Sequence, residues 1–469
     1  MKTIHFVGIG GIGMSGLASM YKSIGYRVCG SDRGSHLAEN QKILAPLRNK
    51  GIAIYPQDGS YSKSEKSVDY LVYSSAIESD NPDFLAMPEN CKKIHRSEAL
   101  QKVINESSFL NTIAVSGSCG KSSVCGLLSE TLYNLTGEVN SLNGAIIKRF
   151  VSESEAGNFH GEGDKFFVFE ADESDKSLVN YSPDYAILLN IGTDHYSKEE
   201  LAEVFAKFIN RVKKLAVVSD EVYSLIQDKI TNDIKIVRFS EKLEDNLSNG
   251  VYFINFYERI ENQGKLNIEI TIDNQYKVTL PMPGFHNGVN ALAVFALLTN
   301  LGFPAEEVSR AITDFHGVAR RFDFIKTNEN QVMIYDDYAH NPEKIISCLK
   351  GAREICNGQI FLIFQPHGYG PLGFMEESLF EFLEENLRAE KELFIMLEAY
   401  YAGGTSSFSP HSKDVIDRYR QKSTNPEKYL YLDSRDAVKE FVKNHACKGD
   451  VVMVMGARDN SLPIFALEL

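Results

Sequence analysis

Short apolar runs alternate with amphipathic stretches along the chain, which is the pattern of an α/β architecture. In the first segment, glycines follow the opening apolar run and lead into apolar residues at helical spacing, Leu17, Met20 and Ile24. The predicted strands of this segment are 3–7, 26–30, 52–55 and 70–74. A polar helix is predicted at 98–108, and a new strand at 112–116 opens the next segment.

Two further segments alternate in the same way. In the second, continuous apolar runs at 166–170 and 185–190 indicate strands buried on both faces of a parallel sheet. Its middle, 251–280, alternates like antiparallel hairpins, with a turn predicted at Asp273 and Asn274. The helices predicted to close this segment are 290–301 and 305–315. The strands predicted in the third segment are 332–335, 359–364, 393–397 and 451–455.

Length and charge limit what these segments can do. The chain has 469 residues, which suggests three domains at roughly 150 residues each. Its 43% hydrophobic and 24% charged residues are typical of a globular protein and exclude a disordered one. The net charge of −14 disfavours general binding to nucleic acids or anionic membranes. A phosphate ligand would therefore need local devices, such as backbone amides or a few placed cations.

The cysteines and the apolar runs indicate the compartment. The seven cysteines are scattered and form no CxxC pair, so we expect mostly buried thiols rather than disulfides or a structural zinc site. The N-terminus does not resemble a signal peptide, and no run approaches the ~18 apolar residues of a membrane span. We therefore expect a cytoplasmic protein. The acidic run 376–390 is predicted to be one solvated helix face.

The first chemical signal is a glycine-rich turn. Gly8, Gly10 and Gly13 satisfy GxGxxG between a strand and a helix, where the backbone can approach a diphosphate and the helix N-terminus supplies amide donors. Asp32 ends the next strand, where an acid can accept ribose hydroxyls. The motif predicts a nucleotide diphosphate without specifying which one. The alternative is a tight turn that binds no ligand.

A stronger signal lies at 117–123, Gly-Ser-Cys-Gly-Lys-Ser-Ser, between a strand and a helical stretch. Val115 stands where the longer Walker motif has glycine. The segment still supplies backbone amides, the point charge of Lys121 and the hydroxyl of Ser122, as a P-loop does. The sequence therefore predicts ATP binding here, against the alternative of a chance Gly-Lys-Ser turn.

Two clusters downstream fit the same site. The acidic run 170–175 and the pair Asp194 and His195 each follow a predicted strand, where parallel sheets place ligands. Together with the Ser122 hydroxyl, a carboxylate and an imidazole could hold a magnesium ion that bridges phosphates. Taken alone, an acidic run is more often solvent-facing and a single histidine more often structural.

Taken together, these motifs resemble those of the Mur ligases, the ATP-dependent amide-forming enzymes of peptidoglycan synthesis. The likeness covers nearly the whole chain. The opening glycine stretch and the DDYAH stretch point to the branch that adds the first amino acid. In chain order, the matching stretches are GIGGIGMSG at 8–16, SSAI at 74–77, Asn81-Pro82, Arg96-Ser97-Glu98, the P-loop, EADESD at 170–175, Asp194-His195, His286-Asn287, Asn290-Ala291, GVARRF at 317–322 and DDYAHNP at 336–342.

The resemblance implies three α/β domains. These would be a Rossmann-like UDP-sugar domain at 1–110, a central P-loop ATPase-like domain at 111–315 and a Rossmann-like amino-acid domain at 316–469. It implies an ATP- and Mg²⁺-dependent ligase that joins an amino acid, with L-alanine expected, to UDP-N-acetylmuramate through an acyl phosphate. No nucleic acid or membrane is expected as a partner, and the expected state is a monomer or homodimer.

Site roles follow from the same resemblance. His340 joins Lys121, Glu170 and His195 as a catalytic candidate, and Ser122, Glu170 and His195 would hold magnesium. The predicted ATP-binding residues of the P-loop are Gly117, Ser118, Gly120, Lys121, Ser122 and Ser123. Asn287 and Asn290 would lie on the adenine side, Arg321 at the phosphates and Asp337 at the ribose. The predicted UDP-sugar residues are Gly10, Gly11, Ile12, Gly13, Asp32, Ser74, Ser75 and Arg96. Tyr338 and His340 would lie near the amino-acid site.

Several positions depart from the family pattern. Cys119 and Ser122 stand where His and Thr are usual, Gly368 and Gly370 follow His367 where arginines are usual, and Arg458 replaces a glycine. These departures concentrate in the acceptor region. They leave open a recycling ligase that adds a preformed peptide, or a non-catalytic relative that binds nucleotides and acts through a partner. A dehydrogenase would use the glycine turn but leaves the P-loop and the 170–175 run unexplained.

Overall fold

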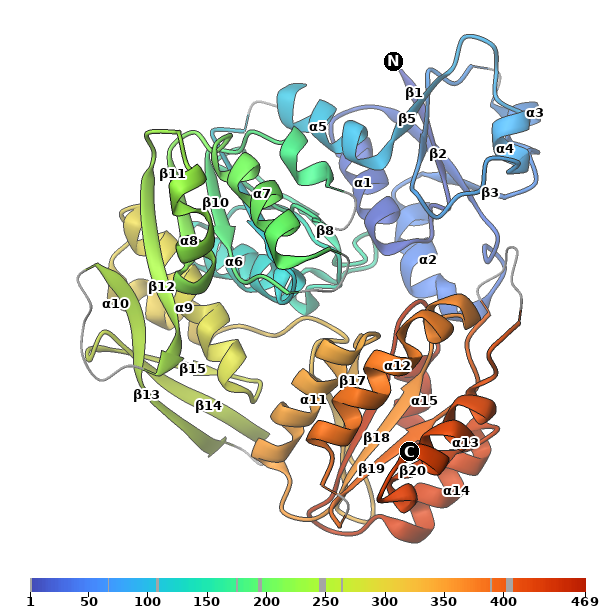
Figure 1. Ribbon diagram of the computed structural model, residues 1–469. Helices are drawn as coiled ribbons and strands as arrows, with labels where there is room; N and C mark the ends of the chain where they lie inside the picture. The colour runs from blue at the N-terminus through green and yellow to red at the C-terminus, as the bar shows by residue number, and fades with distance from the viewer. Residues whose placement is uncertain are drawn as a thin grey trace. The chain divides into compact units, whose positions relative to one another are not determined.

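Most of the predicted strands form the centres of three sheets in the computed structural model of the chain (Figure 1). The structure describes residues 2–65, 67–106, 109–173, 176–192, 196–243, 250–262, 265–388, 390–401 and 408–469. The chain divides into two compact units, which are described separately. The first contains 1–258, 269–281 and 286–318, and the second contains 259–268, 282–285 and 319–469.

The N-terminal sheet of the first unit is parallel throughout its described strands. In sheet order these strands are β3 (Ala53–Pro56), β2 (Arg27–Asp32), β1 (Thr3–Val7), β4 (Tyr70–Tyr73) and β5 (Lys92–His95). The helices between them are α1 (Ile12–Ser23), α2 (Gln41–Asn49), α3 (Tyr61–Ser64), α4 (Pro82–Leu85) and α5 (Arg96–Glu106). Every residue of β1 is buried, which explains why the strand is apolar apart from Thr3 and His5.

The central sheet, most of which belongs to the first unit, is parallel from β12 through β7. In sheet order its strands are β15 (Tyr276–Leu280), β14 (Lys265–Ile272), β13 (Val251–Asn262), β12 (Lys235–Leu243), β11 (Leu215–Ser219), β10 (Tyr185–Leu188), β6 (Asn111–Ser116), β9 (Phe166–Glu170), β7 (Asn140–Leu142) and β8 (Phe159–Gly161). Its helices are α6 (Lys121–Thr136), α7 (Lys198–Ile209), α8 (Asp220–Ile226), α9 (Phe285–Asn300) and α10 (Ala305–Thr313).

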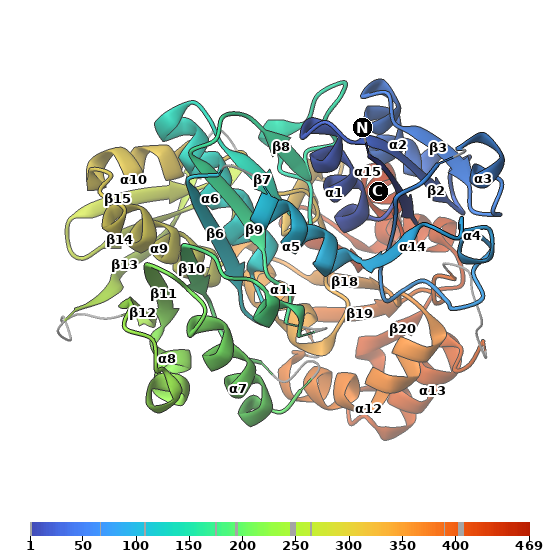
Figure 2. The same ribbon diagram turned by 90° about the horizontal axis from the view of Figure 1, so that it is seen from above.

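Side-chain contacts join these two sheets. Figure 2 shows α1 beside β7 and β8. The Asn158 amide donates to the Ile12 carbonyl at 2.5 Å and to the Ser15 hydroxyl at 2.8 Å, at the start of α1. Lys50 forms an ion pair with Glu155 at 2.5 Å. The helix that follows the glycine turn is therefore anchored to the central part of the chain.

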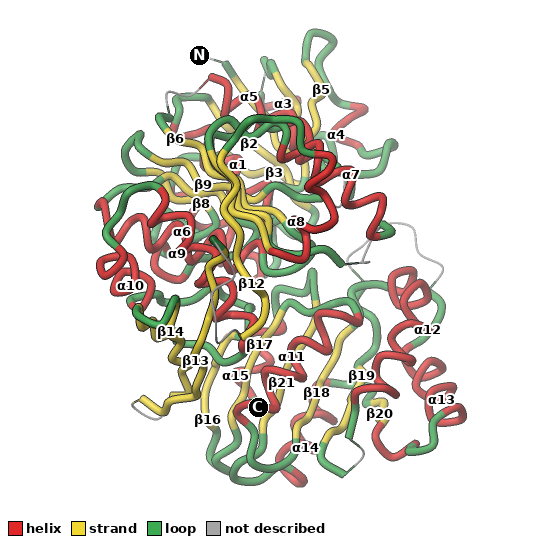
Figure 3. Tube along the Cα trace, turned by 60° about the vertical axis from the view of Figure 1, so that its left-hand side comes forward, coloured by secondary structure: helices red, strands yellow, loops and turns green. Residues whose placement is uncertain are grey.

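The second unit contains a sheet whose described strands are parallel except at one edge, where β16 runs antiparallel to β17. In sheet order the strands are β16 (Asp323–Thr327), β17 (Met333–Asp337), β21 (Val451–Gly456), β18 (Ile360–Gln365), β19 (Glu392–Met396) and β20 (Tyr429–Tyr431). Figure 3 shows the central strands running alongside one another. Its helices are α11 (Pro342–Ile355), α12 (Tyr369–Asn386), α13 (Ser412–Lys422), α14 (Arg435–His445) and α15 (Leu462–Glu468).

Helices cover both faces of this sheet. Side chains of α11, α12 and α13 share one buried core with alternate residues of the central strands, including Met453 and Met455. Those of α14 and α15 pack in a second core with the intervening residues, including Val452 and Val454. Strands buried on both faces have no polar side, so the sequence shows continuous apolar runs here.

Several expectations of the sequence analysis can be compared with the fold. The turn between β14 and β15 contains Asp273 and Asn274 at positive φ of 50° and 59°, as predicted. All seven cysteines are free thiols, and four are buried. The acidic run begins within α12, but Glu376 and Glu384 form ion pairs with Arg418 and Lys428, so that helix face is only partly solvated. Within the described ranges, no helix is long and apolar enough to cross a membrane. The domain boundaries at 110/111 and 315/316 stay predictions.

Candidate active site

The P-loop candidate forms the turn between β6 and α6. Gly117 and Gly120 adopt φ values of 139° and 84°, which side chains rarely tolerate, and α6 begins at Lys121. A Cβ atom on Gly120 would lie 3.0 Å from the Asn290 side-chain oxygen, so Asn290 packs directly against the turn. The neighbouring candidates Ser122 and Asn287 are buried. The turn thus combines tight backbone curvature with the start of a long helix, where amide donors point outward.

Lys121 is held by a carboxylate next to this turn. Its Nζ donates to the Gly117 carbonyl at 2.8 Å and to Glu173 Oε2 at 2.6 Å, and Asp172 lies 3.9 Å away. Burial acts against the charge of Lys121, but Glu173 and Asp172 outweigh it and raise the pKa of the ammonium above its ordinary range. Burial raises the pKa of Glu173, while Lys121 opposes that shift. Lys121 is therefore a charged group that could exchange its hydrogen bond with Glu173 for one with a phosphate.

Two partners of the P-loop were missed in the sequence analysis. Asn190 follows β10 and clamps Cys119 with both ends of its amide, accepting from the Cys119 amide at 2.8 Å and donating to its carbonyl at 3.0 Å. Glu173 lies within the acidic run 170–175, in which the sequence analysis named only Glu170 as a site candidate, for binding magnesium. Strand-end position was the available signal for Asn190, since the predicted strand 185–190 ends there.

The magnesium candidates are only partly covered by the described residues. Glu170 ends β9, which pairs with the P-loop strand β6, and its Oε1 accepts the Gly144 amide at 2.6 Å. Asp194, His195 and the end of the 170–175 run, Ser174 and Asp175, lie outside the described residues. Within the described ranges, no group of three or more His, Cys, Asp or Glu residues has the arrangement of a metal site. The proposed ligand set therefore stays a prediction.

The glycine turn lies at the carboxyl edge of the N-terminal sheet, between β1 and α1. Asp32 ends β2 and holds this turn, because its two carboxylate oxygens accept the amides of Gly10 and Gly34, each at 2.8 Å. Each oxygen can accept a second hydrogen bond, which leaves Asp32 able to bind a ribose hydroxyl as well. The contact with a ribose stays a prediction. The Gly11 carbonyl accepts the amide of Ser15 at 2.9 Å as α1 begins at Ile12.

Arg96 connects the glycine turn with the P-loop region. Its Nη1 lies 2.7 Å from the place of a Cβ on Gly13, so a larger residue there would push the guanidinium aside. Its Nη2 lies 4.0 Å from Asp172, which in turn lies 3.9 Å from Lys121. The predicted sites on the two sheets of the first unit are thus joined by one chain of charges. Ser123 lies in the first turn of α6.

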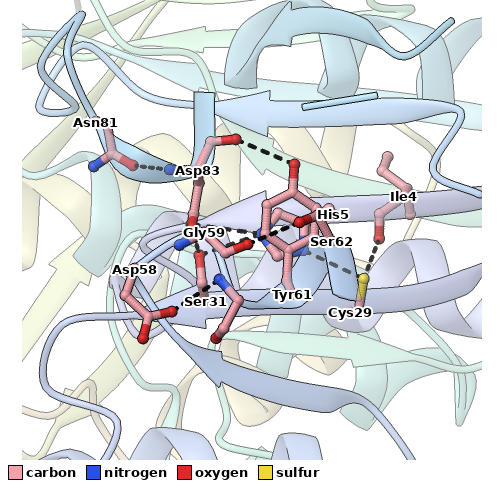
Figure 4. Close-up of polar contacts among 11 residues, drawn as sticks. Ile4, His5, Cys29, Ser31, Asp58, Gly59, Tyr61, Ser62, Asn81 and Asp83 are labelled. Carbon is pink, nitrogen blue, oxygen red and sulfur yellow. Dashed lines mark hydrogen bonds and ion pairs between the residues drawn. The ribbon is translucent and has the colours of Figure 1, made fainter. Parts of the chain in front are cut away.

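A buried polar network fixes the segment that carries Ser74 and Ser75, which follow β4 (Figure 4). Asp83 in α4 is fully buried, accepts a short hydrogen bond from the Ser31 hydroxyl and accepts the Gly59 amide at 2.8 Å. His5 contacts the Ser31 hydroxyl at 3.2 Å and stacks on Tyr61 with ring centroids 3.9 Å apart. Both ends of the 74–82 segment are therefore tied to the sheet.

The remaining candidates lie in the second unit, at the carboxyl end of β17. Asp337 is buried, and its oxygens accept the amides of Phe322 at 2.6 Å and Ala339 at 2.7 Å. The Arg321 guanidinium lies 5.3 Å from the Tyr338 ring centroid, and the Tyr338 and His340 rings are 5.6 Å apart. The structure thus gathers Arg321, Asp337, Tyr338 and His340 at one sheet edge, while the roles that the resemblance implies for them stay predictions.

Comparison with known proteins identifies the family. Three family models match, described as the Mur ligase family catalytic domain at 3–108, the Mur ligase middle domain at 115–298 and the Mur ligase glutamate ligase domain at 320–458. A protein of Acetivibrio thermocellus named UDP-N-acetylmuramate–L-alanine ligase is 31% identical over 98% of this chain and 94% of its own. The chain belongs to the Mur ligase family. Mur ligases are ATP-dependent enzymes, and they form amide bonds in peptidoglycan synthesis.

Solved Mur ligase structures share the three-domain α/β architecture. The crystal structure of the UDP-N-acetylmuramate–alanine ligase MurC from Thermotoga maritima is 26% identical, covers 100% of this chain and 98% of its own, and has a TM-score of 0.77. A murein peptide ligase from Psychrobacter arcticus, 21% identical, covers 100% of this chain and 99% of its own with a TM-score of 0.69, and shows the fold alone. The Mur ligase fold therefore extends over the whole chain.

The buried His5 should make stability depend on pH. Burial lowers the pKa of His5 below its ordinary value of 6.5, although Asp83 opposes the shift. The unfolded chain thus binds this proton at higher pH than the folded chain, and the free energy of unfolding should fall as the pH drops below about 6.5, by up to about 1.4 kcal/mol per pH unit for one proton. Denaturant titrations from pH 7.5 to 5 should show a smaller fall in His5→Gln. The exposed His36→Gln variant is the control, and an equal fall in all three proteins would contradict the assignment.

Releasing Lys121 should strengthen ATP binding in the absence of metal. In Glu173→Gln the lysine loses an ion pair that phosphate must otherwise displace, and a pair of this kind contributes about 1 kcal/mol, equivalent to about fivefold in Kd. Calorimetric titration with ATP in the presence of EDTA measures the change. Asp172→Asn is the matched control, because its carboxylate is 3.9 Å from Lys121 rather than 2.6 Å, and it should have a smaller effect. Weaker ATP binding by Glu173→Gln would show that Glu173 supports the ligand instead.

Proposed function

We propose that this chain joins L-alanine to UDP-N-acetylmuramate at the expense of ATP. The observation that carries the proposal is the match over 98% of the chain to a relative named for this activity. The site supports it, because Arg96 packs against the glycine turn and lies 4.0 Å from Asp172, which lies 3.9 Å from the P-loop lysine Lys121 in the same unit. The alternatives are a ligase that adds a preformed peptide and a relative that binds nucleotides without catalysis.

The β6–α6 turn is proposed to hold the ATP phosphates. Amides of residues 117–123 would donate to phosphate oxygens, and Lys121 would leave Glu173 to neutralise charge between the β- and γ-phosphates. Asn287 and Asn290 would contact the adenine side. Arg321 is proposed to meet the phosphates and Asp337 the ribose.

Ser122, Glu170 and His195 are proposed to hold Mg²⁺. The two described members fit this ion, since a hydroxyl and a carboxylate are hard oxygen ligands and Mg²⁺ binds few protein groups directly when phosphates complete its shell. Bound there, the metal would neutralise charge on the phosphates. The protein groups would align the two reactants and keep them in place.

UDP-N-acetylmuramate is proposed to occupy the glycine-turn edge. Gly10, Gly11, Ile12 and Gly13 would approach the diphosphate. Asp32, Ser74, Ser75 and Arg96 would contribute polar contacts, with Arg96 placed to meet either phosphate or the reacting carboxylate. Tyr338 and His340 are proposed to contact the amino acid.

The reaction proposed has two steps. A carboxylate oxygen of the sugar attacks the γ-phosphorus of ATP, the bond between that phosphorus and the β,γ-bridging oxygen breaks, and ADP leaves. The amine of L-alanine, having lost a proton, then attacks the acyl carbon, and the carbon–oxygen bond to phosphate breaks. Phosphorylation is needed because a free carboxylate has no adequate leaving group, and positioning with charge neutralisation supplies most of the catalysis.

A panel of acceptors tests the proposal. With ATP, Mg²⁺ and UDP-N-acetylmuramate present, L-alanine should drive phosphate release faster than glycine, L-serine or a preformed peptide. The measurement is phosphate release together with mass spectrometry of the amide product. Faster turnover with the peptide would favour the recycling ligase. ATP binding without turnover of any acceptor would favour the non-catalytic alternative.

Loss of the Lys121 charge should abolish most of the turnover. Removing one preorganised donor at a developing charge costs on the order of 10²–10³ in rate, so Lys121→Ala should lose at least about a hundredfold in kcat. Lys207→Ala on the exposed face of α7 is the matched control and should retain the full rate. Steady-state phosphate release measures both variants, and thermal unfolding checks that each is folded. An unchanged kcat in a folded Lys121→Ala protein would refute the role.

A further inference from the structure

Two neighbouring strands of the C-terminal sheet send their following loops to opposite faces. β21 and β18 pair in parallel, with Met455 opposite Phe364. After β18 the chain enters α12, which packs in the core of one face, and after β21 it enters α15, which packs in the core of the other. Loops that diverge in this way leave a crevice at the carboxyl ends of the strands, where open α/β sheets bind ligands.

The loop after β21 is rigidly braced. Asp459 is buried and accepts from the Arg435 guanidinium at 2.6 Å and from the Gln365 amide at 3.0 Å. Arg320 donates to the carbonyls of Gly456 at 2.7 Å and Asp459 at 3.1 Å. These contacts fix the backbone on both sides of Arg458.

Arg458 is held in an unusual conformation by this bracing. Its φ is +66°, in the left-handed region that favours glycine, and its side chain is exposed. Such strain persists only where the surroundings determine it, and it often accompanies function. Arg320 forms an ion pair with Asp336, and Arg435 forms one with Asp459. In the described part of the chain, no residue pairs with the Arg458 guanidinium.

The neighbours of Arg458 are suited to an amino acid. Its amide donates to the Tyr338 hydroxyl at 3.4 Å, the Tyr338 and His340 rings are 5.6 Å apart, and the His340 and His367 rings are 5.1 Å apart. His340 Nδ1 donates to the Tyr338 carbonyl at 2.9 Å, so Nε2 carries the lone pair of the neutral ring. After His367, Gly368 and Gly370 supply no charge, whereas Arg458 in the loop after β21 does.

We infer that Arg458 binds the α-carboxylate of the acceptor amino acid at this crevice. Its planar guanidinium can hold both carboxylate oxygens at once, which a lysine cannot do. The imidazoles of His340 and His367 beside it carry no negative charge, so they do not repel the carboxylate. This inference rests on the proposed ligase function and adds to it the group that selects a free carboxylate.

The test separates acceptor binding from phosphorylation of the sugar. Arg458→Gly removes the guanidinium and relieves the positive φ, so this variant should fold at least as stably as the wild type. Its KM for L-alanine should rise about tenfold to a hundredfold, as expected for loss of a charged hydrogen-bonding partner. Its KM for L-alaninamide, which has no carboxylate, should change by less than about twofold. Arg458→Lys should have a KM for L-alanine between those of the wild type and Arg458→Gly.

A second readout excludes a general loss of structure. Without amino acid, hydroxylamine attacks the acyl phosphate, the carbon–oxygen bond to phosphate breaks, and a hydroxamate forms at a rate that reports the first step alone. This rate should stay within about twofold of wild type in Arg458→Gly, and exposed Arg420→Ala on α13 serves as the matched control for all assays. An equal ratio of KM for L-alanine and L-alaninamide in wild type and Arg458→Gly would overturn the inference alone. A wild-type protein that forms neither hydroxamate nor amide would overturn the proposed function and, with it, this inference.

Discussion

Parallel strand pairing is the constraint on which the rest of this molecule depends. Because neighbouring strands run in the same direction, the loops that follow them emerge at one edge of each sheet. This brings the glycine turn and Asp32 together on the N-terminal sheet, and the P-loop, Glu170 and Asn190 together on the central sheet. It also brings His340, His367 and Arg458 together on the C-terminal sheet. Chemistry-bearing residues far apart in sequence become neighbours without any local pattern between them.

An acidic protein can use phosphate ligands only if it controls charge locally. With a net charge of −14, the chain as a whole repels phosphate. Lys121 instead remains charged in an ion pair with Glu173, and a phosphate could take the place of the Glu173 carboxylate in that pair. Arg96 is placed against the turn of α1 by the missing Cβ of Gly13 and lies near Asp172. Balanced pairs of this kind leave the overall charge acidic and still offer each phosphate a cation.

Sequence reasoning predicted the central strands of the sheets. It did not predict the short strands near the sheet edges or the residues that pair with the site side chains. The runs 3–7 and 166–170 coincide with β1 and β9, because strands buried on both faces are mostly apolar. Strands such as β7, next to the edge strand β8 and with the sequence Asn-Ser-Leu, are too short and polar to stand out. The motifs located the P-loop, but the pairing of Lys121 with Glu173 depends on where the loop turns back after β9. No periodicity encodes that direction.

The same reasoning explains why a departure from the family pattern need not mean lost function. Gly368 and Gly370 remove charge from the loop after β18, while Arg458 adds charge to the loop after β21, and β21 and β18 are adjacent strands. Read along the sequence, these changes lie about ninety positions apart and look unrelated. At the carboxyl edge of the sheet they lie in the loops of two adjacent strands, and the buried Asp459 that fixes the Arg458 loop also accepts from Gln365 at the end of β18. A cation lost from one loop can therefore be supplied by its neighbour, because the sheet, and not the sequence, sets which residues share a ligand.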